Sequence, residues 1–578
     1  MRSLRTRKTE QENKEMMKSS GYGVVYTPDS LSDYVAYLLV QEFKKNIIDE
    51  KNTEITILDP ACGEGALLEA SERAFKRCCK DISTRYIGID VDEKVVLKNA
   101  KKHNNKAYTF HSCDTLLPNE NEDPVAYWGK KGISPELIIA NPPWSSEKIY
   151  SKSELTEAGY KFDVGQYDSY VLFIELCLKL IKPDGYVAFI IPDSIFSSEN
   201  RELRKFLCDN TQIKVISRLG EKLFAGVNRA TTVLVIKNTP PCENSETICF
   251  RLSTDQRRAY LSGEQSLIDF HNQHAHSVMQ RRFRENVGYI FDVDTLRDEE
   301  SLLRKLQEQS IEWNQVFHFG RGVEISKSGM VVTCPHCGMA QGYSKKQYTD
   351  GEKKCSNCAK SIVVNSDSVS KIIEASHHSG YQRIYVGENL HRYALRGSCY
   401  IKMDVPGINY KEEKLYEPPK ILIRKTGLGI NACIDYESTY ISQTVYSCNY
   451  LDTNNNVPLE YYLGVLNSRV LYYYYLKKYG ENEWKSHPYF TKDIVFSLPI
   501  PQVTEDKKEL SMRIAKSVRQ LQTSYSRTLD LEIEKMIIEL YGLTANEIRL
   551  VVQCINQLPD LGAINHMKTK EEELCLDI

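Results

Sequence analysis

Seven short apolar runs alternate with amphipathic segments between residues 21 and 240, and this alternation limits the possible folds more than any other feature. Runs of this kind predict strands, here at Ile55–Asp59, Arg85–Asp90, Tyr108–His111, Leu137–Asn141, Tyr186–Pro192, Lys214–Leu219 and Thr232–Lys237. Strands that alternate with helices form a mostly parallel sheet that is covered on both faces. We therefore expect an α/β domain over residues 21–240.

The remaining chain changes in character several times. Residues 1–20 are basic and polar, which predicts a flexible tail. After Thr239-Pro240-Pro241 a charge-rich stretch, 241–315, predicts a connector or insertion of helices and loops. Short β-rich runs then predict a separate, mainly β domain over 316–504, with strands at Gln382–Gly387, Lys420–Lys425 and Thr439–Val445.

The last segment, 505–578, has helical signals. Ile533, Ile537 and Leu540 fall on one helical face, and Gly542 stands where a helix C-cap is expected. Thr544 is followed three residues later by Glu547, the pattern of a capping box. A helical hairpin is the expected result.

Length and composition exclude several protein classes. A chain of 578 residues suggests about three to four domains. No run approaches the ~18 apolar residues of a membrane span, and the basic N-terminus lacks an apolar signal core. The 17 cysteines are an odd number that suits a reducing compartment better than a disulfide framework. We expect a cytoplasmic protein without a membrane partner.

The first predicted strand runs directly into a glycine turn, Pro60-Ala61-Cys62-Gly63-Glu64-Gly65, and then into a helix. A strand, glycine turn and helix let a nucleotide-like ligand approach the backbone closely. A dinucleotide fingerprint needs a third glycine near position 68, where Leu68 stands, so NAD and FAD are disfavoured.

Acidic residues follow the next two predicted strands. Asp90 ends the second, where a carboxylate can accept hydrogen bonds from two ribose hydroxyls. Asp114, followed by Thr115, comes after the third strand, in a position to accept from an adenine amino group. A single Asp in such a place is more often a loop or cap residue, but together with the glycine turn these residues predict a nucleoside site.

The fourth predicted strand ends in Asn141-Pro142-Pro143-Trp144. Two prolines fix φ and remove two backbone donors, so this corner is rigid and rich in acceptors. The Asn141 side-chain oxygen and the Pro142 carbonyl can hold the two hydrogens of a planar amino group, while Trp144 stacks on its ring. The amino group then becomes a nucleophile aimed at an electrophilic methyl group. The alternative for the tetrapeptide alone is a rigid turn.

Five segments, in their order along the chain, resemble the motifs of gamma-class N6-adenine DNA methyltransferases. They are Gly23–Pro28, Asp59–Gly65, Asp90, Asp114 and Asn141–Trp144. The resemblance implies a Rossmann-like domain that uses S-adenosylmethionine and flips the target base out of the duplex. It also implies the site residues. For the donor these are Tyr26, Thr27, Pro28, Asp59, Ala61, Gly63, Gly65, Asp90, Asp114 and Thr115. For the target base they are Asn141, Pro142, Pro143, Trp144 and Phe224. Gln166–Tyr170 resembles the helix start that lines the same pocket. Trp144 stands where Tyr or Phe is commoner.

Two Cys-x-x-Cys pairs, Cys334/Cys337 and Cys355/Cys358, are separated by a spacing typical of a four-cysteine zinc site. Two such pairs give tetrahedral thiolate coordination without an open position, so we expect a structural zinc ribbon over 331–361. His271, His274 and His276 have no matching ligand partners and predict no metal site. Cys242 follows the last strand and has no predicted role as a nucleophile.

Residues 316–500 hold 22 Lys/Arg against 17 Asp/Glu, and 20 of the 36 tyrosines, including Tyr472–Tyr475. The whole chain has a net charge of -2, so its cationic surplus is local. Phenols stack and hydrogen-bond to phosphates and base edges, although about half of these tyrosines suit a β-domain core. Three segments resemble parts of a TaqI-like specificity domain, namely Ile421–Thr426, Leu463–Ser468 and Leu498–Pro501. Arg424 and Lys425 are the candidate DNA contacts.

The sequence as a whole predicts an adenine-N6 methyltransferase that acts on double-stranded DNA, of restriction-modification or phage-defence type. A separately encoded restriction endonuclease or defence protein is a possible partner. Two alternatives stay open. The same motif occurs in methyltransferases of RNA and of protein glutamine, and the chain could be a DNA-binding subunit that is active only within a larger complex.

Overall fold

The computed structural model spans the chain and falls into two compact units, with the boundary between Arg297 and Asp298. The residues whose structure is described are 27–46, 54–119, 122–144, 150–162, 168–224, 229–308, 310–343, 351–365, 368–451, 456–480 and 490–574.

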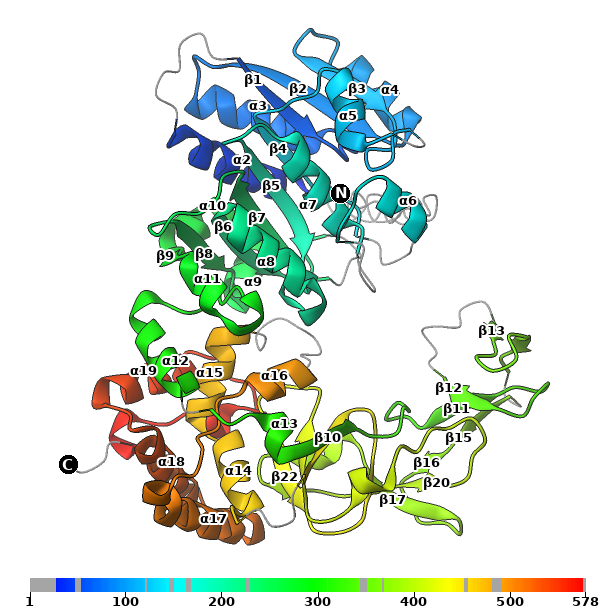
Figure 1. Cartoon of the computed structure of the whole chain (residues 1–578), viewed down its shortest axis with the longest axis vertical. Coiled ribbons are helices and arrows are strands. Elements are labelled where there is room, and N and C mark those ends of the chain that lie inside the picture. Colours follow the sequence, from blue (N-terminus) through cyan, green and yellow to red (C-terminus); the bar gives the residue numbers. More distant parts are fainter. Residues whose placement is uncertain are drawn as a thin grey trace, which may run out of the picture. The chain divides into compact units, whose positions relative to one another are not determined.

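The first unit is built on a nine-stranded sheet with the strand order β3-β2-β1-β4-β5-β7-β6-β8-β9 (Figure 1). The strands β3, β2, β1, β4 and β5 run parallel, whereas β7 is antiparallel to both of its neighbours. All seven predicted strands are confirmed within one or two residues. Their bounds are β1 (Glu54–Asp59), β2 (Ser83–Asp90), β3 (Tyr108–Ser112), β4 (Leu137–Ala140), β5 (Tyr186–Pro192), β6 (Gln212–Gly220) and β7 (Thr231–Lys237).

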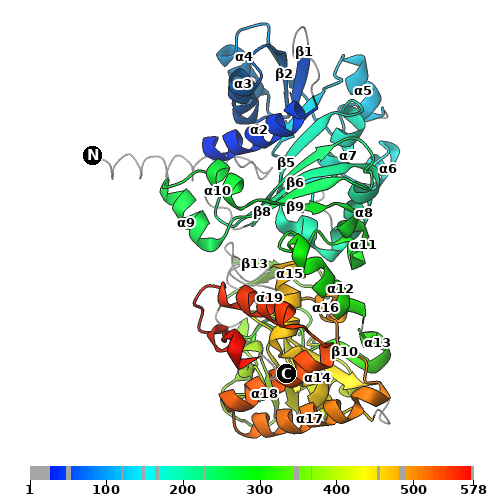
Figure 2. The same ribbon diagram turned by 90° about the vertical axis from the view of Figure 1, so that its left-hand side faces the viewer.

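Helices cover both faces of this sheet, as Figure 2 shows. Alternate strand residues face opposite ways, so Leu137 and Ile139 join one apolar core with α2 and α3, while Ile138 and Ala140 join another with α5, α7 and α8. The helices are α2 (Asp29–Lys44), α3 (Ala66–Cys78), α4 (Glu93–Lys102), α5 (Pro124–Lys130), α6 (Lys152–Glu157), α7 (Tyr170–Leu180), α8 (Arg201–Asn210), α9 (Thr254–Ser262), α10 (Leu267–His274) and α11 (Arg281–Glu285).

The stretch 241–315, expected as a connector, is divided between the two units. It supplies β8 (Glu246–Arg251) and β9 (His276–Met279), which extend the sheet beyond β6. Apolar residues of this stretch, among them Phe250 and Val278, are buried in the two cores of the first unit. From Asp298 onward the chain packs into the second unit instead. The α/β domain therefore reaches about sixty residues beyond the predicted boundary at 240.

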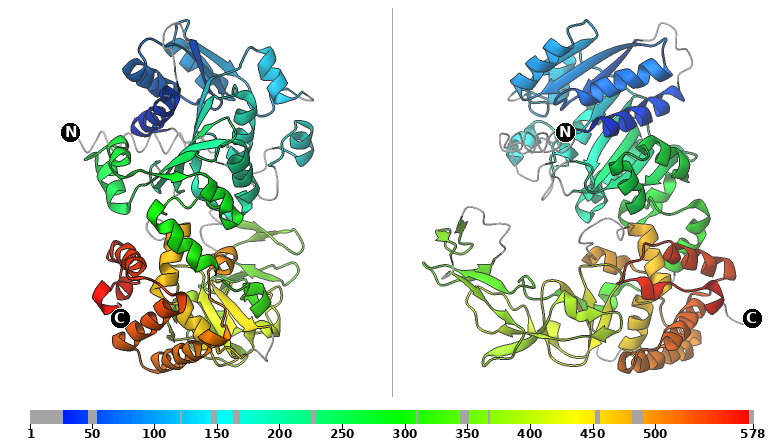
Figure 3. Two further views of the ribbon diagram at one scale, coloured as in Figure 1. Left: turned by 60° about the vertical axis from the view of Figure 1, so that its left-hand side comes forward. Right: turned by 180° about the vertical axis from the view of Figure 1, so that it is seen from behind.

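The second unit contains a strand-rich part and a helical part, which Figure 3 shows as neighbours. Strands β10-β24-β21-β22 form an antiparallel sheet. Strands β16-β20-β17-β23 form a mixed sheet, in which β23 runs parallel to β17. Smaller sheets are formed by β12-β11-β15, β13-β14 and β18-β19. The predicted strand at Thr439–Val445 is instead two strands, β23 and β24. The bounds are β10 (Phe317–Arg321), β11 (Met330–Thr333), β12 (Ala340–Gly342), β13 (Glu352–Lys354), β14 (Ser361–Val363), β15 (Val369–Lys371), β16 (Ile373–Glu374), β17 (Tyr381–Tyr385), β18 (Leu390–His391), β19 (Ala394–Leu395), β20 (Cys399–Lys402), β21 (Lys420–Arg424), β22 (Ala432–Asp435), β23 (Tyr440–Ile441) and β24 (Val445–Tyr450).

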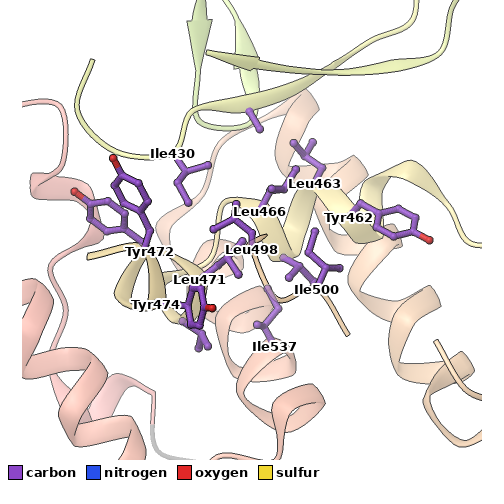
Figure 4. Close-up of a cluster of buried hydrophobic side chains, with 14 of the residues drawn as sticks. Ile430, Tyr462, Leu463, Leu466, Leu471, Tyr472, Tyr474, Leu498, Ile500 and Ile537 are labelled. Carbon is purple, nitrogen blue, oxygen red and sulfur yellow. The ribbon is translucent and has the colours of Figure 1, made fainter. Parts of the chain in front are cut away.

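One large apolar core joins the helices of this unit to β21, β22 and β24. Figure 4 shows Leu463, Leu466, Leu471 and Ile537 gathered in this core. The predicted αL cap at Gly542 and the capping box of Thr544 and Glu547 are both present. The helices are α12 (Glu300–Glu308), α13 (Trp313–Val316), α14 (Leu459–Leu466), α15 (Arg469–Tyr479), α16 (Lys492–Ser497), α17 (Lys508–Thr523), α18 (Arg527–Tyr541) and α19 (Ala545–Asn556).

The tyrosine run Tyr472–Tyr475 lies in α15 and is buried in the same core, with at most 3% of each residue exposed. These four residues therefore belong to the core and are not available to read DNA. Among the residues that the structure describes, no helix combines the length and apolar character needed to cross a membrane.

Candidate active site

The glycine turn after β1 brings backbone and carboxylate together at the end of the strand. Asp59 is buried, and its Oδ1 accepts a hydrogen bond from the Ala61 N–H at 3.1 Å. Burial raises the pKa of Asp59 to about 8. Gly65 has φ = +83° at the N-cap of α3, a conformation that strongly favours glycine. The turn thus places a buried carboxyl group beside backbone that a ligand can approach.

Asp90, at the end of β2, is fixed by backbone donors on both carboxylate oxygens. The Gly63 N–H donates to Oδ2 at 2.8 Å, and the Asp92 N–H donates to Oδ1 at 2.9 Å. The first of these bonds ties the glycine turn to the neighbouring strand. Each carboxylate oxygen can accept a further hydrogen bond, so Asp90 can hold a ligand without changing its orientation.

Asp114 follows β3 and is held in a similar way. Its Oδ1 accepts from the backbone N–H groups of Leu116 and Leu117 at 2.9 and 3.2 Å. Its Oδ2 accepts from the Tyr150 hydroxyl at 2.7 Å. The Thr115 hydroxyl donates to the Pro60 carbonyl at 2.6 Å, which fixes the loop after β3 against the glycine turn.

The motif Asn141–Trp144 follows β4 and is held by contacts from separate segments. The Asn141 Nδ2 donates to the Thr27 hydroxyl at 3.0 Å. The Ser169 hydroxyl donates to the Pro143 carbonyl at 2.5 Å. The amide nitrogen of Asn141 therefore faces Thr27, and the Oδ1 is on the other side of the amide group.

The side chains of Trp144 and Phe224 are in contact at the site. Their rings meet edge to face, with centroids 5.3 Å apart and an interplanar angle of 87°. The Trp144 indole N–H donates to the Ile190 carbonyl at 3.3 Å. Phe224 is buried, whereas Trp144 is partly exposed. The two aromatic residues that the sequence assigned to the target base are therefore brought together.

A cavity of about 290 Å³ lies at the carboxyl ends of β1, β2, β3 and β4. The chain moves outward from β1 through β3 and then crosses to β4 on the other side, so this is the switch point at which α/β sheets bind ligands. The predicted residues that line it are Thr27, Asp59, Ala61, Gly63, Asp90, Asp114, Thr115, Asn141, Pro142, Pro143, Trp144 and Phe224.

Two predicted donor-site residues, Pro28 and Gly65, are not among the described residues that line this cavity. Pro28 is the N-cap of α2, and its carbonyl accepts from the N–H groups of Leu31 and Ser32. Gly65 acts through the turn that it forms before α3. Tyr26 lies outside the described residues, as do Gln166 and Tyr167 of the predicted helix start.

Several residues at the site were missed by sequence analysis. Tyr150 and Phe173 line the cavity, and Arg229 donates to the Trp144 carbonyl at 3.1 Å. Tyr150 and Arg229 come from stretches without regular spacing, so no sequence pattern marks them. Phe173 lies within the apolar run of α7 and looks like an ordinary core residue there.

The four cysteines Cys334, Cys337, Cys355 and Cys358 form one cluster, with all sulfur atoms within 4.8 Å of one another. Two Sγ···Sγ distances, Cys334 to Cys358 and Cys337 to Cys355, are both 3.7 Å. The two loops are equivalent, because Cys334 and Cys355 each donate an N–H to the carbonyl five residues later at 2.9 Å. Both loops contain a residue with positive φ, Gly338 and Ala359.

The candidate DNA contacts lie at the end of β21. Arg424 folds back so that its Nε donates to the Thr426 carbonyl at 2.5 Å. Lys425 lies over the Tyr446 ring, with its Nζ 5.8 Å from the centroid. Both residues are partly buried, and burial lowers the pKa of Lys425, as does the nearby Arg321.

Comparison with known proteins identifies the family of the first unit. The family described as N-6 DNA Methylase matches residues 12–314, more than half of the chain. The chain belongs to the N-6 DNA methylase family. Residues 382–500 match the TaqI-like C-terminal specificity domain, so the N-6 DNA methylase fold is followed here by a separate specificity domain with many strands.

Similar proteins agree with this assignment. The Type II methyltransferase M.BanIII of Aneurinibacillus aneurinilyticus is 30% identical over 220 residues, which cover 36% of this chain and 38% of that protein. The Type II methyltransferase M.VspI of Vibrio sp. (strain 343) is 26% identical over 255 residues, which cover 43% and 56%. The match thus spans only about two fifths to just over half of these relatives.

A solved structure is similar in fold over most of the chain. It is a nuclease-deletion mutant of the Type ISP restriction-modification enzyme LlaGI in complex with a DNA substrate mimic. The TM-score is 0.51 at 12% identity, covering 88% of this chain and 55% of that one. The likeness shows that the fold of both units occurs together in a known structure.

Proposed function

We propose that this protein transfers a methyl group from S-adenosylmethionine to N6 of adenine in double-stranded DNA, in a restriction-modification or phage-defence system. The observation that carries the proposal is that one cavity contains both the acidic residues Asp59, Asp90 and Asp114 and the motif Asn141–Trp144. A donor site and an amino-group site that share a cavity can bring a nucleophile and an electrophile into contact.

The residues that line the cavity fit S-adenosylmethionine, the methyl donor. Asp90 has acceptor capacity for ribose hydroxyls, and the Oδ2 of Asp114 can accept from an adenine amino group beside the Tyr150 hydroxyl. The buried Asp59 carboxyl suits a cationic ligand, because a positive charge nearby favours its ionised form. When bound, the donor supplies an electrophilic methyl group.

The motif after β4 would bind and orient the target base. Asn141 Oδ1 and the Pro142 carbonyl would accept the two amino hydrogens, which raises the nucleophilicity of the nitrogen. Trp144 and Phe224 would contact the faces of the base. An adenine inside a duplex cannot reach this cavity, so it has to be flipped out at a cost of a few kcal/mol. No covalent intermediate with the protein is required.

The second unit would read the DNA. The surplus of Lys and Arg over Asp and Glu within residues 316–500 supports phosphate binding by that part of the unit. Arg424 and Lys425 remain our candidates, because Lys425 lies near the like charge of Arg321 in a partly buried setting. A phosphate group bound between such cations would relieve their repulsion.

We also propose that the four-cysteine cluster holds a structural zinc ion. Tetrahedral coordination at about 2.3 Å places sulfur atoms about 3.8 Å apart, close to the 3.7 Å found for two of the pairs. Among the described residues, the buried members of the surrounding core are only Val332, Cys334, Cys355 and Ile362. A core of this size needs a metal or another cross-link for stability.

Zinc content tests the metal proposal directly. We expect about one zinc per chain by atomic emission, and a clear loss in Cys355→Ser. Cys242→Ser is the matched control, because Cys242 is exposed and outside the cluster. Purified protein without zinc, or full zinc content in the Cys355→Ser variant, would contradict the proposal.

Asn141→Ala tests the function. The protein is incubated with labelled donor and, separately, with unmethylated plasmid DNA, RNA and protein. We expect label only in DNA, as N6-methyladenine, and a fall of about 100-fold or more in Asn141→Ala with donor affinity retained. Sequencing of the product DNA then reveals the site.

Each other outcome has a clear meaning. Label in RNA or protein alone would identify one of the alternative substrates. Donor binding without transfer, until a partner protein is added, would identify a subunit of a larger complex. An undiminished rate in Asn141→Ala would refute the assigned role of the motif.

A further inference from the structure

The carbonyl groups of Asn141–Trp144 are held by side chains from elsewhere in the unit. Because Pro142 and Pro143 lack N–H groups, a regular turn cannot stabilise this loop with its own backbone donors. The Ser169 hydroxyl donates to the Pro143 carbonyl at 2.5 Å. Arg229 Nη1 donates to the Trp144 carbonyl at 3.1 Å. Both contacts fix the end of the loop that carries the aromatic ring.

Arg229 is itself held in place by an acidic partner. Its Nη2 forms an ion pair with Asp168 Oδ2, and the side chains of Arg229 and Asp168 are 37% and 12% exposed. The same Asp168 oxygen accepts from the Ser194 hydroxyl at 3.2 Å. Asp168 immediately precedes Ser169, so the loop after β4 is tied to one short segment at two successive carbonyls.

Arg229 also lies close to the Trp144 ring. Its guanidinium carbon is 6.0 Å from the ring centroid, within the range of a cation–π contact. One side chain thus contacts Trp144 at the carbonyl and approaches it at the indole. The planar guanidinium can serve two partners at fixed angles, which an ammonium cannot do.

We infer that Arg229, held by Asp168, is a positioning residue for the target base and acts through Trp144. This inference rests on the proposed function. Arg229 fixes the peptide plane after Trp144, and with it the direction of the indole ring against which the base would stack. Arg229 does not line the donor cavity, so its effect should fall on transfer and spare donor binding.

The test compares Arg229→Ala, Arg229→Lys and Asp168→Asn in the full chain, with Arg258→Ala as control. Arg258 forms an equivalent ion pair with Asp255, but both side chains are largely exposed on α9. Single-turnover methylation of unmethylated plasmid DNA gives the transfer rate, and titration with S-adenosylhomocysteine gives the affinity of the donor site.

We expect Arg229→Ala to lower the transfer rate about 10- to 100-fold, the effect of misplacing a reacting group by about 1 Å. Arg229→Lys should be intermediate, because it keeps the charge but not the two-pronged contact. Asp168→Asn should lower the rate by less than Arg229→Ala does. Affinity for S-adenosylhomocysteine should change less than about twofold in all variants, because none of the substituted residues lines the donor cavity.

An undiminished rate in Arg229→Ala would overturn the inference. So would a parallel loss of donor-site affinity, because that result indicates general disruption of the unit. If Arg229→Ala does not fold, the comparison of Arg229→Lys with the parent decides. If the parent transfers no methyl group to DNA, the proposed function fails and the inference fails with it.

Discussion

Replacement of Arg469 by Met should strongly destabilise the second unit. The Arg469 side chain is fully buried and forms ion pairs with Asp530 and Glu534 at 3.0 and 3.2 Å. Arg392 pairs with the other oxygen of Asp530 at 2.6 Å. Two cations and two anions, each at most 5% exposed, therefore balance one another in the core.

The expected loss of stability follows from this balance of buried charges. Without Arg469, three buried charges remain, and one carboxylate has lost its partner. Arg469 also donates to the Met567 carbonyl at 2.8 Å, so that acceptor is left without this bond. Breaking one partner of a buried pair costs about 3 to 5 kcal/mol. Met keeps much of the side-chain volume, so the effect of a cavity is small in comparison.

Hydrogen exchange of the full chain measures this loss in the unit where it occurs. For amides of α15 and α18 that exchange through global opening of the unit, 3 to 5 kcal/mol corresponds to exchange about 100- to 5,000-fold faster. Arg549→Met is the control, because Arg549 is half exposed and forms its ion pair with the partly exposed Glu571, which predicts a change below about 0.5 kcal/mol.

A double variant separates charge from packing. Arg469→Met with Glu534→Gln restores a balance of one cation and one anion, and should recover part of the loss. Unchanged exchange in Arg469→Met would refute the reasoning. A double variant as unstable as the single one would show that charge imbalance is not the cause.

Two further predictions concern the first unit. Gly88→Ala should lower its free energy of unfolding by about 1 to 3 kcal/mol in thermal denaturation, because the new Cβ would lie 2.7 Å from Phe110 and 2.9 Å from the Cys62 sulfur. Gly132→Ala, at a glycine with open space around it but with positive φ, controls for backbone effects alone. Burial lowers the pKa of His271 to about 4. The unfolded chain, with a His pKa near ~6.5, then binds the proton more readily, so stability that is complete above about pH 6.5 is lost progressively towards pH 4. Exchange of α2 and α10 amides should show a loss of about 2 kcal/mol between pH 7.5 and pH 5, and no such loss in His271→Gln; equal pH dependence in both proteins would contradict this assignment.

Sequence patterns predicted the sheet of the first unit because its central strands are buried on both faces. Such strands are continuous apolar runs, and Tyr186–Pro192 and Thr232–Lys237 were recognised for this reason. The last two strands of the sheet, β8 and the edge strand β9, were missed because charged and polar residues interrupt them, as in Glu246–Arg251. The four tyrosines of α15 were assigned partly to DNA contact, since a helix that is buried all round has no 3.6-residue period to reveal its environment.

For the candidate site, the sequence predicted those residues that lie at the end of a strand. Asp59 and Asp90 end parallel strands, Asp114 and Asn141 come just after two others, and the fold brings such positions to one edge of the sheet. Tyr150 and Arg229 reach the same place from loops. Their positions depend on how those loops pack in three dimensions, which spacing along the chain does not encode.

The edge-to-face contact of Trp144 with Phe224 has an optical consequence. Two rings that enclose a base must stand about 7 Å apart, twice the roughly 3.4 Å rise of stacked bases, whereas these centroids are 5.3 Å apart. Trp144 must therefore leave Phe224 as a base arrives, and indole emission depends on what lies against the ring. With the other three tryptophans replaced, Trp144 would report the arrival of an unmodified adenine in real time, without a fluorescent base in the DNA.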